Sequence, residues 1–334
     1  TARLGHDIVV YEATSELGGL LRSAIAFNRL PRKVLDWDIE GIREMGVKTE
    51  TNKALGKDFT IESLLNNNFE AVLLTTGGWD SRLARGAADQ IEEPIPGTHL
   101  LVDLARHAKS GKLQIRYNAV IAGGDKLAVQ CAELLKEQGA DKITIVYRES
   151  EDQKPGGIVD ATGLLEKGIE VKFDCAVNKL FGEKAKLKKI EVVDVNTGKK
   201  EMMPAQTLFL AAGRFPELIF SRVGEVSQQG EEDETSYGPL KWIAQPPYKR
   251  PAIKDEIGLF SESEEKTDHQ AAIKAIGAGR RVAASIHQLI YGIDFHLGND
   301  VVQPDSDIQN IYELTDEDVK SSSRNLNSGH SPKS

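Results

Sequence analysis

Short apolar runs recur along the chain, and several are separated by stretches in which apolar residues have helical spacing. The runs predict strands at residues 8–11, 71–76, 118–122, 142–147, 169–173, 190–195 and 208–212. Two helices are predicted, one at 127–138 that Gly139 caps and an amphipathic one at 271–291. The strands at 169–173 and 190–195, with a turn at Asn196 to Gly198, predict a β-meander. Alternating strands and helices are typical of an α/β fold with parallel sheets.

A βαβ unit is predicted in the middle of the chain. The strand at 118–122 is followed at once by Gly123 and Gly124, then by a helix and by a strand that closes on Arg148. This order is typical of a dinucleotide-binding unit. Glycines in such a turn allow backbone amides to approach a phosphate, because no Cβ intrudes.

A second pattern of the dinucleotide-binding type lies at the start of the chain. The strand at 8–11, which we expect to be buried and parallel, ends at Glu12, and Gly18 and Gly19 follow. In a dinucleotide-binding unit the acid that closes the second strand accepts hydrogen bonds from ribose hydroxyls. Residues 1–6 would then be the tail of the first helix, and the first strand and its glycine-rich turn would precede residue 1. The alternative is a strand with an ordinary glycine turn.

Composition narrows the class of protein. The 334 residues suffice for two domains, and 40% hydrophobic with 28% charged residues is typical of a soluble globular protein. A net charge of −9 argues against a nucleic-acid binder, and no apolar run approaches the roughly 20 residues of a membrane span. Cys131 and Cys175 have neither CxxC nor metal-ligand spacing and are expected to be small buried hydrophobic residues. We expect a cytoplasmic protein without a metal site.

Several short motifs, taken in order, resemble one known family. They are Gly18 to Arg22 (GGLLR), Arg29 to Pro31 (RLP), Val34 to Asp36 (VLD), Leu74 to Gly77 (LTTG), Ile95 to Gly97 (IPG), Val146 to Arg148 (VYR), Ala212 to Pro216 (AGRFP) and Ala272 to Ala283. The chain resembles a divergent, N-terminally incomplete copy of the small-subunit type of glutamate synthase. That family includes the flavoprotein half of related NAD(P)H-dependent electron-transfer enzymes. The similarity spans about residues 1–320.

The resemblance implies two Rossmann-like domains, with an NAD(P)-type domain inserted into an FAD-type domain. The FAD-binding domain takes residues 1–105 and 250–300, and the inserted NAD(P)H-binding domain takes 106–220. Residues 221–249 are expected to be a surface excursion, and 301–334 a C-terminal connector and tail. The nicotinamide would reduce the flavin, which would pass electrons to an iron–sulfur or larger catalytic subunit of a redox complex. No catalytic side chain is implied, because the cofactors carry the chemistry.

The resemblance also implies which residues bind the cofactors, FAD and either NADPH or NADH. Glu12 would hold the FAD ribose, Arg22 would offset phosphate charge, and Arg148 would pair with the 2′-phosphate of NADP. The whole set is Glu12, Gly18, Gly19, Leu20, Arg22, Thr76, Gly77, Gly123, Gly124, Arg148, Gly213, Glu264, Ala272 and Ile273.

The inserted domain departs from the family pattern. Ala122 and Leu127 stand where the family's phosphate loop has glycine and a small residue, and Asp125 adds negative charge. We expect Ala122 to strain the turn and Leu127 to push the helix away from the strand. Glu149, next to Arg148, weakens the preference for NADPH.

The flavin side departs from the pattern at residues 258–264. Glu262 and Ser263 replace two glycines there, and Glu264 takes the place of the family's aspartate. Two functions therefore stay open. The chain is an FAD-dependent NAD(P)H oxidoreductase, or it is a degenerate flavin-only relay or non-catalytic scaffold subunit of a redox complex.

Overall fold

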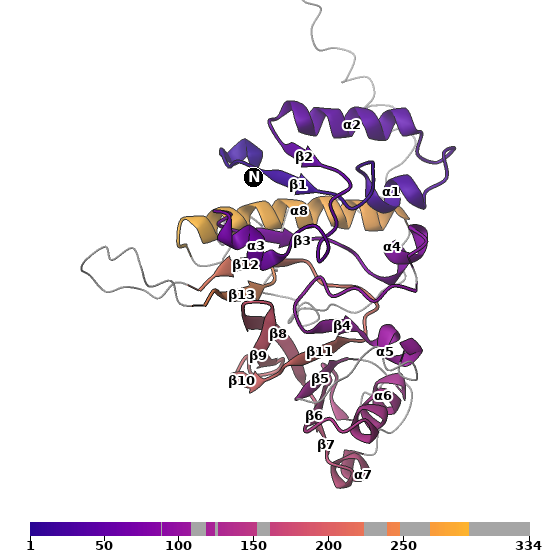
Figure 1. Ribbon diagram of the computed structural model, residues 1–334, viewed down its shortest axis with the longest axis vertical. Coiled ribbons are helices and arrows are strands. Elements are labelled where there is room, and N and C mark those ends of the chain that lie inside the picture. Colours follow the sequence, from indigo (N-terminus) through magenta and orange to yellow (C-terminus); the bar gives the residue numbers. More distant parts are fainter. Residues whose placement is uncertain are drawn as a thin grey trace, which may run out of the picture. The chain divides into compact units, whose positions relative to one another are not determined.

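The computed structural model describes residues 1–87, 89–107, 118–123, 126–151, 161–223, 239–247 and 268–293 (Figure 1). The helices are η1 (Ala2–Leu4), α1 (Gly19–Ser23), α2 (Arg32–Glu44), α3 (Ile61–Asn66), α4 (Trp79–Ala84), α5 (Leu101–His107), α6 (Lys126–Glu137), α7 (Ala161–Glu166) and α8 (Asp268–Ile290). The strands are β1 (Val9–Tyr11), β2 (Lys48–Glu50), β3 (Val72–Leu74), β4 (Thr98–Leu100), β5 (Ala119–Ala122), β6 (Ile143–Val146), β7 (Ile169–Lys172), β8 (Cys175–Glu183), β9 (Lys186–Asp194), β10 (Lys200–Pro204), β11 (Thr207–Leu210), β12 (Leu218–Arg222) and β13 (Lys241–Gln245). They form sheets of two, five and six strands, and the predicted α/β class is confirmed.

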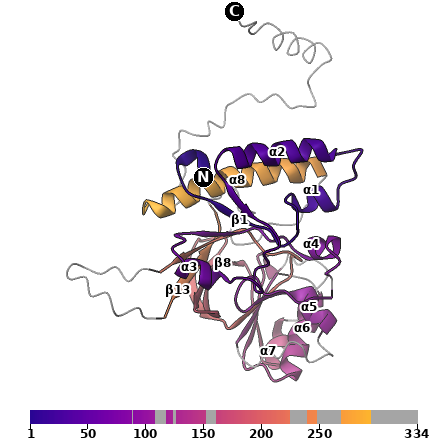
Figure 2. The same ribbon diagram turned by 45° about the horizontal axis from the view of Figure 1, so that its top comes forward.

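The five-stranded sheet is parallel throughout and has the order β4-β11-β5-β6-β7. Every residue of β5, β6 and β11 is buried, as their continuous apolar sequences require. Helices α5, α6 and α7 lie along this sheet in both views (Figures 1 and 2). Gly139, with a φ of 88°, follows the end of α6. The predicted βαβ unit and its glycine cap are therefore confirmed.

The six-stranded sheet is antiparallel, with the order β10-β9-β8-β13-β12-β3, and it shares a core with the parallel sheet. Along β5 the side chains alternate, so that Ile121 packs with the helices and Val120 packs with residues of β8 and β9. The predicted turn at Asn196 to Gly198 is confirmed, because it joins β9 to β10. Asp194 Oδ1 accepts the Asn196 N–H there at 3.0 Å. The meander consists of β8, β9 and β10, and the prediction that the strand at 169–173 belongs to it was wrong, since β7 pairs with β6 in parallel.

The prediction that residues 221–249 form a surface excursion was wrong for the part that the structure describes. Residues 241–245 form β13, which lies between β8 and β12. Trp242 is 1% exposed and packs on Gly182, where a Cβ would come within 1.9 Å of the indole ring. Only Trp242 and Ala244 of this strand are fully buried, so the apolar signal was too short to predict a strand.

Strand β1 is parallel, as predicted, but the prediction that it is buried was wrong. It pairs with β2, and Val10 is 39% exposed. Within the described residues β1 and β2 form a sheet of their own, so β1 has a strand neighbour on one side only. The short helix η1, which ends at Gly5 with a φ of 86°, fits the predicted helix end at residues 1–6.

Helix α8 is the longest of the described helices, at 23 residues, and its side chains are described from residue 275 onward. Val282 and Ser285 on it are buried. His287 Nδ1 lies 2.9 Å from His6 Nε2, so α8 meets the start of the chain. Neither α8 nor any other described helix combines the length and the hydropathy that crossing a bilayer requires.

Candidate functional site

Glu12 lies directly after β1, and its backbone is held by the segment that follows β2. Its N–H donates to the Glu50 carbonyl, and its own carbonyl accepts the Lys53 N–H, each at 2.9 Å. Its carboxylate Oε1 accepts from the Thr14 N–H at 2.8 Å and from the Thr14 hydroxyl at 2.9 Å. No residue that the structure describes donates to Oε2. With respect to the described residues, one carboxylate oxygen is therefore available to a ligand, as a ribose-binding acid requires.

The glycine pair at the start of α1 adopts backbone conformations that favour glycine. Gly18 has a φ of 121° and Gly19 a φ of 50°. At Gly18 a Cβ would lie 3.0 Å from Leu35 Cδ2, so the loop passes close to α2. At Gly19 the Cβ side is open for 4 Å, and Leu20 is 36% exposed. The backbone of Gly19 can thus be approached closely, which fits the predicted contact with FAD.

Arg22 is already engaged by protein groups. Its Nε donates to the Leu17 carbonyl at 2.6 Å, and its two terminal nitrogens pair with Glu16, at 3.3 Å, and with Asp36. The side chain is 15% exposed. These contacts fasten the loop between β1 and α1 to α2, and two carboxylates offset the guanidinium charge. A contact between Arg22 and a FAD phosphate stays a prediction.

A second pair of glycines, at the end of β3, meets the segment that follows β11. The Trp79 N–H donates to the Gly213 carbonyl at 2.9 Å. A Cβ on Gly78 would lie 2.4 Å from Arg214 Cα, so the backbones can cross only because residue 78 has no side chain. Gly77, with a φ of 76°, also needs glycine. The structure therefore gives Gly77 and Gly213 a structural role at this crossing.

Thr76 precedes the crossing and carries a buried side-chain hydroxyl group. Its Oγ1 is buried and has no partner among the described residues. A buried hydroxyl without a partner costs free energy, which a polar ligand can recover. Helix α4, which starts at Trp79, contacts α1. The sets around Gly18 to Arg22 and around Thr76 therefore lie on neighbouring elements, and the residues present fit an FAD molecule.

The predicted nicotinamide site lies at the carboxyl ends of β5 and β6. Gly123 has a φ of 73°, and its N–H donates to the Val146 carbonyl at 2.9 Å. Arg148 is half-buried two residues beyond the end of the adjacent strand. Ligands of doubly wound sheets bind at this edge. Gly124 and Asp125 lie outside the described residues.

The strained turn at Ala122 and the displacement of the helix by Leu127, which the altered phosphate loop leads us to expect, are both missing from the described part of the structure. Ala122 is the last residue of β5 and is not among the residues with positive φ; Gly123 supplies the left-handed conformation instead. Leu127 is 38% exposed, while Ala128 is fully buried against the sheet. The close approach of helix and strand therefore depends on Ala128, and the prediction that Leu127 pushes them apart was wrong.

Of the remaining predicted residues the structure describes only the backbone or nothing at all. Glu264, with the altered residues Glu262 and Ser263, lies outside the described residues. Ala272 and Ile273 belong to α8, but nothing can be said of their side chains.

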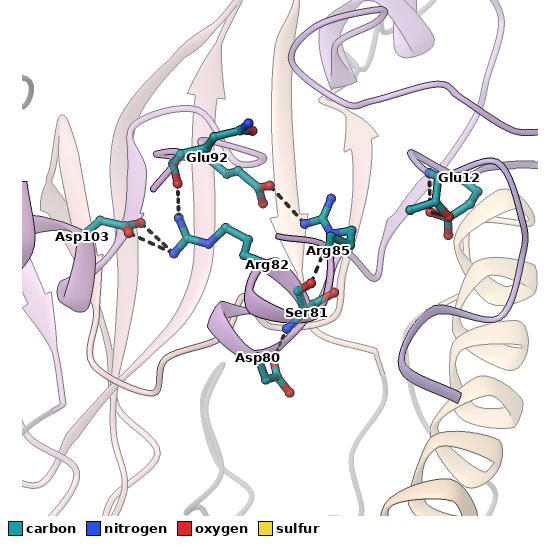
Figure 3. A network of polar contacts seen from close by, with 9 residues as sticks. Glu12, Asp80, Ser81, Arg82, Arg85, Glu92 and Asp103 are labelled. Atoms are coloured by element: carbon teal, nitrogen blue, oxygen red, sulfur yellow. Dashed lines mark hydrogen bonds and ion pairs between the residues drawn. The ribbon is translucent and has the colours of Figure 1, made fainter. Parts of the chain in front are cut away.

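A buried ion pair that no sequence motif predicts lies beside the crossing (Figure 3). Arg82 on α4 donates from one nitrogen to both Asp103 oxygens, at 2.9 and 3.0 Å, and from another to the Gln90 carbonyl at 2.6 Å. The two charged side chains are 1% and 0% exposed. The guanidinium groups of Arg82 and Arg106 each lie over the Trp79 ring, at 5.2 and 4.7 Å from its centre. The cluster joins α4 to α5.

The two cysteines are free thiols. Burial raises the pKa of Cys131 to about 11, and burial followed by the nearby Asp194 raises the pKa of the half-buried Cys175. Both are therefore protonated near neutral pH, whereas thiol redox chemistry uses the thiolate. In the described residues no three His, Cys, Asp or Glu side chains are grouped as metal ligands.

A parallel dinucleotide-type sheet, together with an acid and glycines of the kind found in a second dinucleotide-binding unit, is typical of proteins with two Rossmann-like domains. The chain belongs to the pyridine nucleotide-disulphide oxidoreductase family, whose model matches residues 20–230. Members of this family are FAD-dependent NAD(P)H oxidoreductases. The predicted relationship to NAD(P)H-dependent oxidoreductases is thereby confirmed.

Three proteins that are similar in sequence to this chain bear the names of enzyme subunits. The NAD-dependent dihydropyrimidine dehydrogenase subunit PreT of Escherichia coli K12 is 27% identical over 290 residues, which cover 86% of this chain and 64% of the relative. The NADP(+)-dependent formate dehydrogenase subunit beta of Moorella thermoacetica is 25% identical over 303 residues, covering 86% and 41%. The NADPH-Fe(3+) oxidoreductase subunit beta of Geobacter sulfurreducens is 25% identical over 332 residues, covering 90% and 49%. The chain thus spans less than two thirds of each relative.

Proposed function

We propose that this chain is a cytoplasmic FAD-dependent NAD(P)H oxidoreductase subunit that passes electrons to an iron–sulfur partner. The observation that carries the proposal is the Glu12 carboxylate, fixed at the end of a parallel strand with one oxygen open and followed by the exposed backbone of Gly19. Three relatives named as subunits of NAD(P)-dependent enzymes support the partner. When bound, FAD accepts a hydride from the reduced nicotinamide and releases electrons to the acceptor.

The chain's own residues would bind and orient the two nucleotides. Glu12 would accept hydrogen bonds from the FAD ribose, and the Thr76 hydroxyl would gain a partner from the same cofactor. Gly123 would leave room for the nicotinamide nucleotide's phosphates, and Arg148 would lie at the ribose end. The protonated state of Cys131 and Cys175 favours direct electron transfer to a partner over a thiol relay within this chain.

The rival function, a scaffold without flavin, is favoured by one observation. Arg22 is neutralised by Glu16 and Asp36, so no net positive charge is left there for the FAD pyrophosphate. FAD binding would require Arg22 to exchange at least one carboxylate for phosphate.

An anaerobic absorbance spectrum of the protein after addition of FAD separates these functions. We expect a bound flavin spectrum that bleaches when NADPH or NADH is added, and the faster nucleotide identifies the preferred donor. A bound flavin that neither nucleotide bleaches would refute the nicotinamide half of the proposal and favour the flavin-only relay. Failure to bind FAD would refute the whole proposal and leave the scaffold.

A matched pair of variants tests the residue that carries the proposal. Glu12→Gln should weaken FAD binding about tenfold or more, because a charged acceptor of ribose hydrogen bonds becomes neutral. Glu40→Gln, which changes a 61% exposed side chain on α2, serves as the control. Equal FAD affinity for both variants would remove Glu12 from the site.

A further inference from the structure

The two oxygens of the Glu12 carboxylate have different surroundings. Oε1 accepts two hydrogen bonds from Thr14, one from the backbone N–H and one from the hydroxyl. A carboxylate offers about four acceptor positions, two on each oxygen. Thr14 therefore fills Oε1, and both positions on Oε2 stay open with respect to the described residues.

Thr14 is itself held in place. Its carbonyl accepts the Asn52 N–H at 2.9 Å, which ties it to the segment after β2. Its hydroxyl also lies 2.8 Å from the Glu16 carbonyl. Since a hydroxyl has one proton and both neighbours are acceptors, it donates to Glu12 or to Glu16 at any one time. The Thr14 N–H has no such competing acceptor.

We propose that Thr14 is a positioning residue that occupies Oε1 of Glu12 and so presents Oε2 to the ribose diol of the bound nucleotide. The inference rests on the proposed FAD-binding function of the same site. An unconstrained glutamate rotates about its terminal torsion and loses entropy on binding. A carboxylate held by the Thr14 N–H, and by the Thr14 hydroxyl whenever that does not donate to Glu16, is already oriented. Thr14 thereby determines how strongly the site depends on ribose hydroxyls.

The test compares FAD with its analogue that lacks the 2′-hydroxyl of the adenosine, by calorimetric titration of the full chain. The wild type should bind the analogue about tenfold more weakly than FAD, the loss expected for a hydrogen bond to a charged acceptor. Thr14→Val, which keeps the backbone N–H but removes the hydroxyl, should bind FAD roughly three- to tenfold more weakly and should discriminate less against the analogue. Thr14→Ser should restore both values.

Thr49→Val is the matched control. Thr49 lies on β2, opposite Val10, and its hydroxyl accepts from Arg43 at 3.2 Å, so its loss leaves Glu12 untouched. Circular dichroism of all variants checks that they fold alike.

The outcomes separate the inference from the function on which it rests. If the wild type binds FAD and discriminates, but Thr14→Val discriminates equally well, Thr14 has no positioning role and only the inference fails. If the wild type binds FAD and the analogue equally well, Glu12 does not bind the ribose 2′-hydroxyl. The inference then fails together with the assignment of Glu12 to the ribose. If no FAD binds, the proposed function fails as well.

Discussion

The buried ion pair between Arg82 and Asp103 offers the sharpest test of how the chain is held together. In Arg82→Met the volume is nearly kept, but Asp103, 0% exposed, loses both hydrogen bonds from its partner, and the Gln90 carbonyl loses its donor. Removing one member of a buried pair costs about 3–5 kcal/mol, because the other charge stays buried without compensation. The cation–π contact with Trp79, at 5.2 Å, adds about 0.5–1 kcal/mol. We expect a loss of about 4 kcal/mol in the free energy of unfolding.

Urea denaturation followed by circular dichroism measures this loss, provided that a second probe gives the same transition. The double variant Arg82→Met with Asp103→Leu should recover most of it, since replacing a whole buried pair by apolar side chains is often neutral. Arg85→Met is the control, because Arg85 and its partner Glu92 are 26% and 28% exposed and such pairs contribute about 0–1 kcal/mol. A loss below about 1 kcal/mol for Arg82→Met, or a double variant weaker than the single one, would refute the reasoning.

Three further predictions follow from packing and charge. Gly78→Ala should lower the free energy of unfolding by about 2 kcal/mol or more, because the added Cβ would lie 2.4 Å from Arg214 Cα. Gly41→Ala on α2, where the Cβ meets open space, should raise it by about 0.5–1 kcal/mol. Equal shifts in melting temperature for the two variants would contradict this prediction. Burial lowers the pKa of His99 despite nearby carboxylates, so the free energy of unfolding should fall as the pH drops below about 6.5. His99→Leu should make this pH dependence weaker. The same pH dependence for both proteins in urea denaturation at several pH values would contradict the prediction. In the same denaturation experiment Ala128→Leu should lower the free energy of unfolding by about 1–3 kcal/mol, because Ala128 is fully buried, and Leu127→Ala should lower it by less than about 1 kcal/mol. The reverse order would support the expectation that Leu127 pushes the helix away from the strand.

The strands that the sequence predicted well are those of the parallel sheet. Both of its faces are covered, so β5, β6 and β11 consist of consecutive buried residues, and an unbroken apolar run identifies them. The antiparallel sheet is harder to predict, because its strands mix buried and exposed positions. Asn178 and Lys179 separate buried residues of β8, and β13 has only two buried residues, flanked by Lys241 and Gln245, so its sequence resembles a polar loop.

The candidate site was predictable only where its chemistry is local in sequence. Glu12 follows its strand directly, and Gly18 and Gly19 lie a few residues further on. Thr14, the partner of Glu12, is equally close, and an acid followed two residues later by threonine is the local pattern from which this contact is predictable. The contacts of Arg82 are different: Asp103 is separated by 21 positions, and composition cannot pair one charge among many with another.

The structure also changes which residues support a nucleotide-binding function. Gly77 and Gly213 belong to motifs of the family resemblance, but the crossing of two backbone segments at Gly78 already explains them, with or without a cofactor. Nothing within the described structure explains the open oxygen of Glu12 or the uncovered backbone of Gly19 in the same way. Because the described residues assign those two features no structural role, they support a bound dinucleotide more specifically than the motif glycines do, and variants at Glu12 test that argument more directly than variants at those glycines.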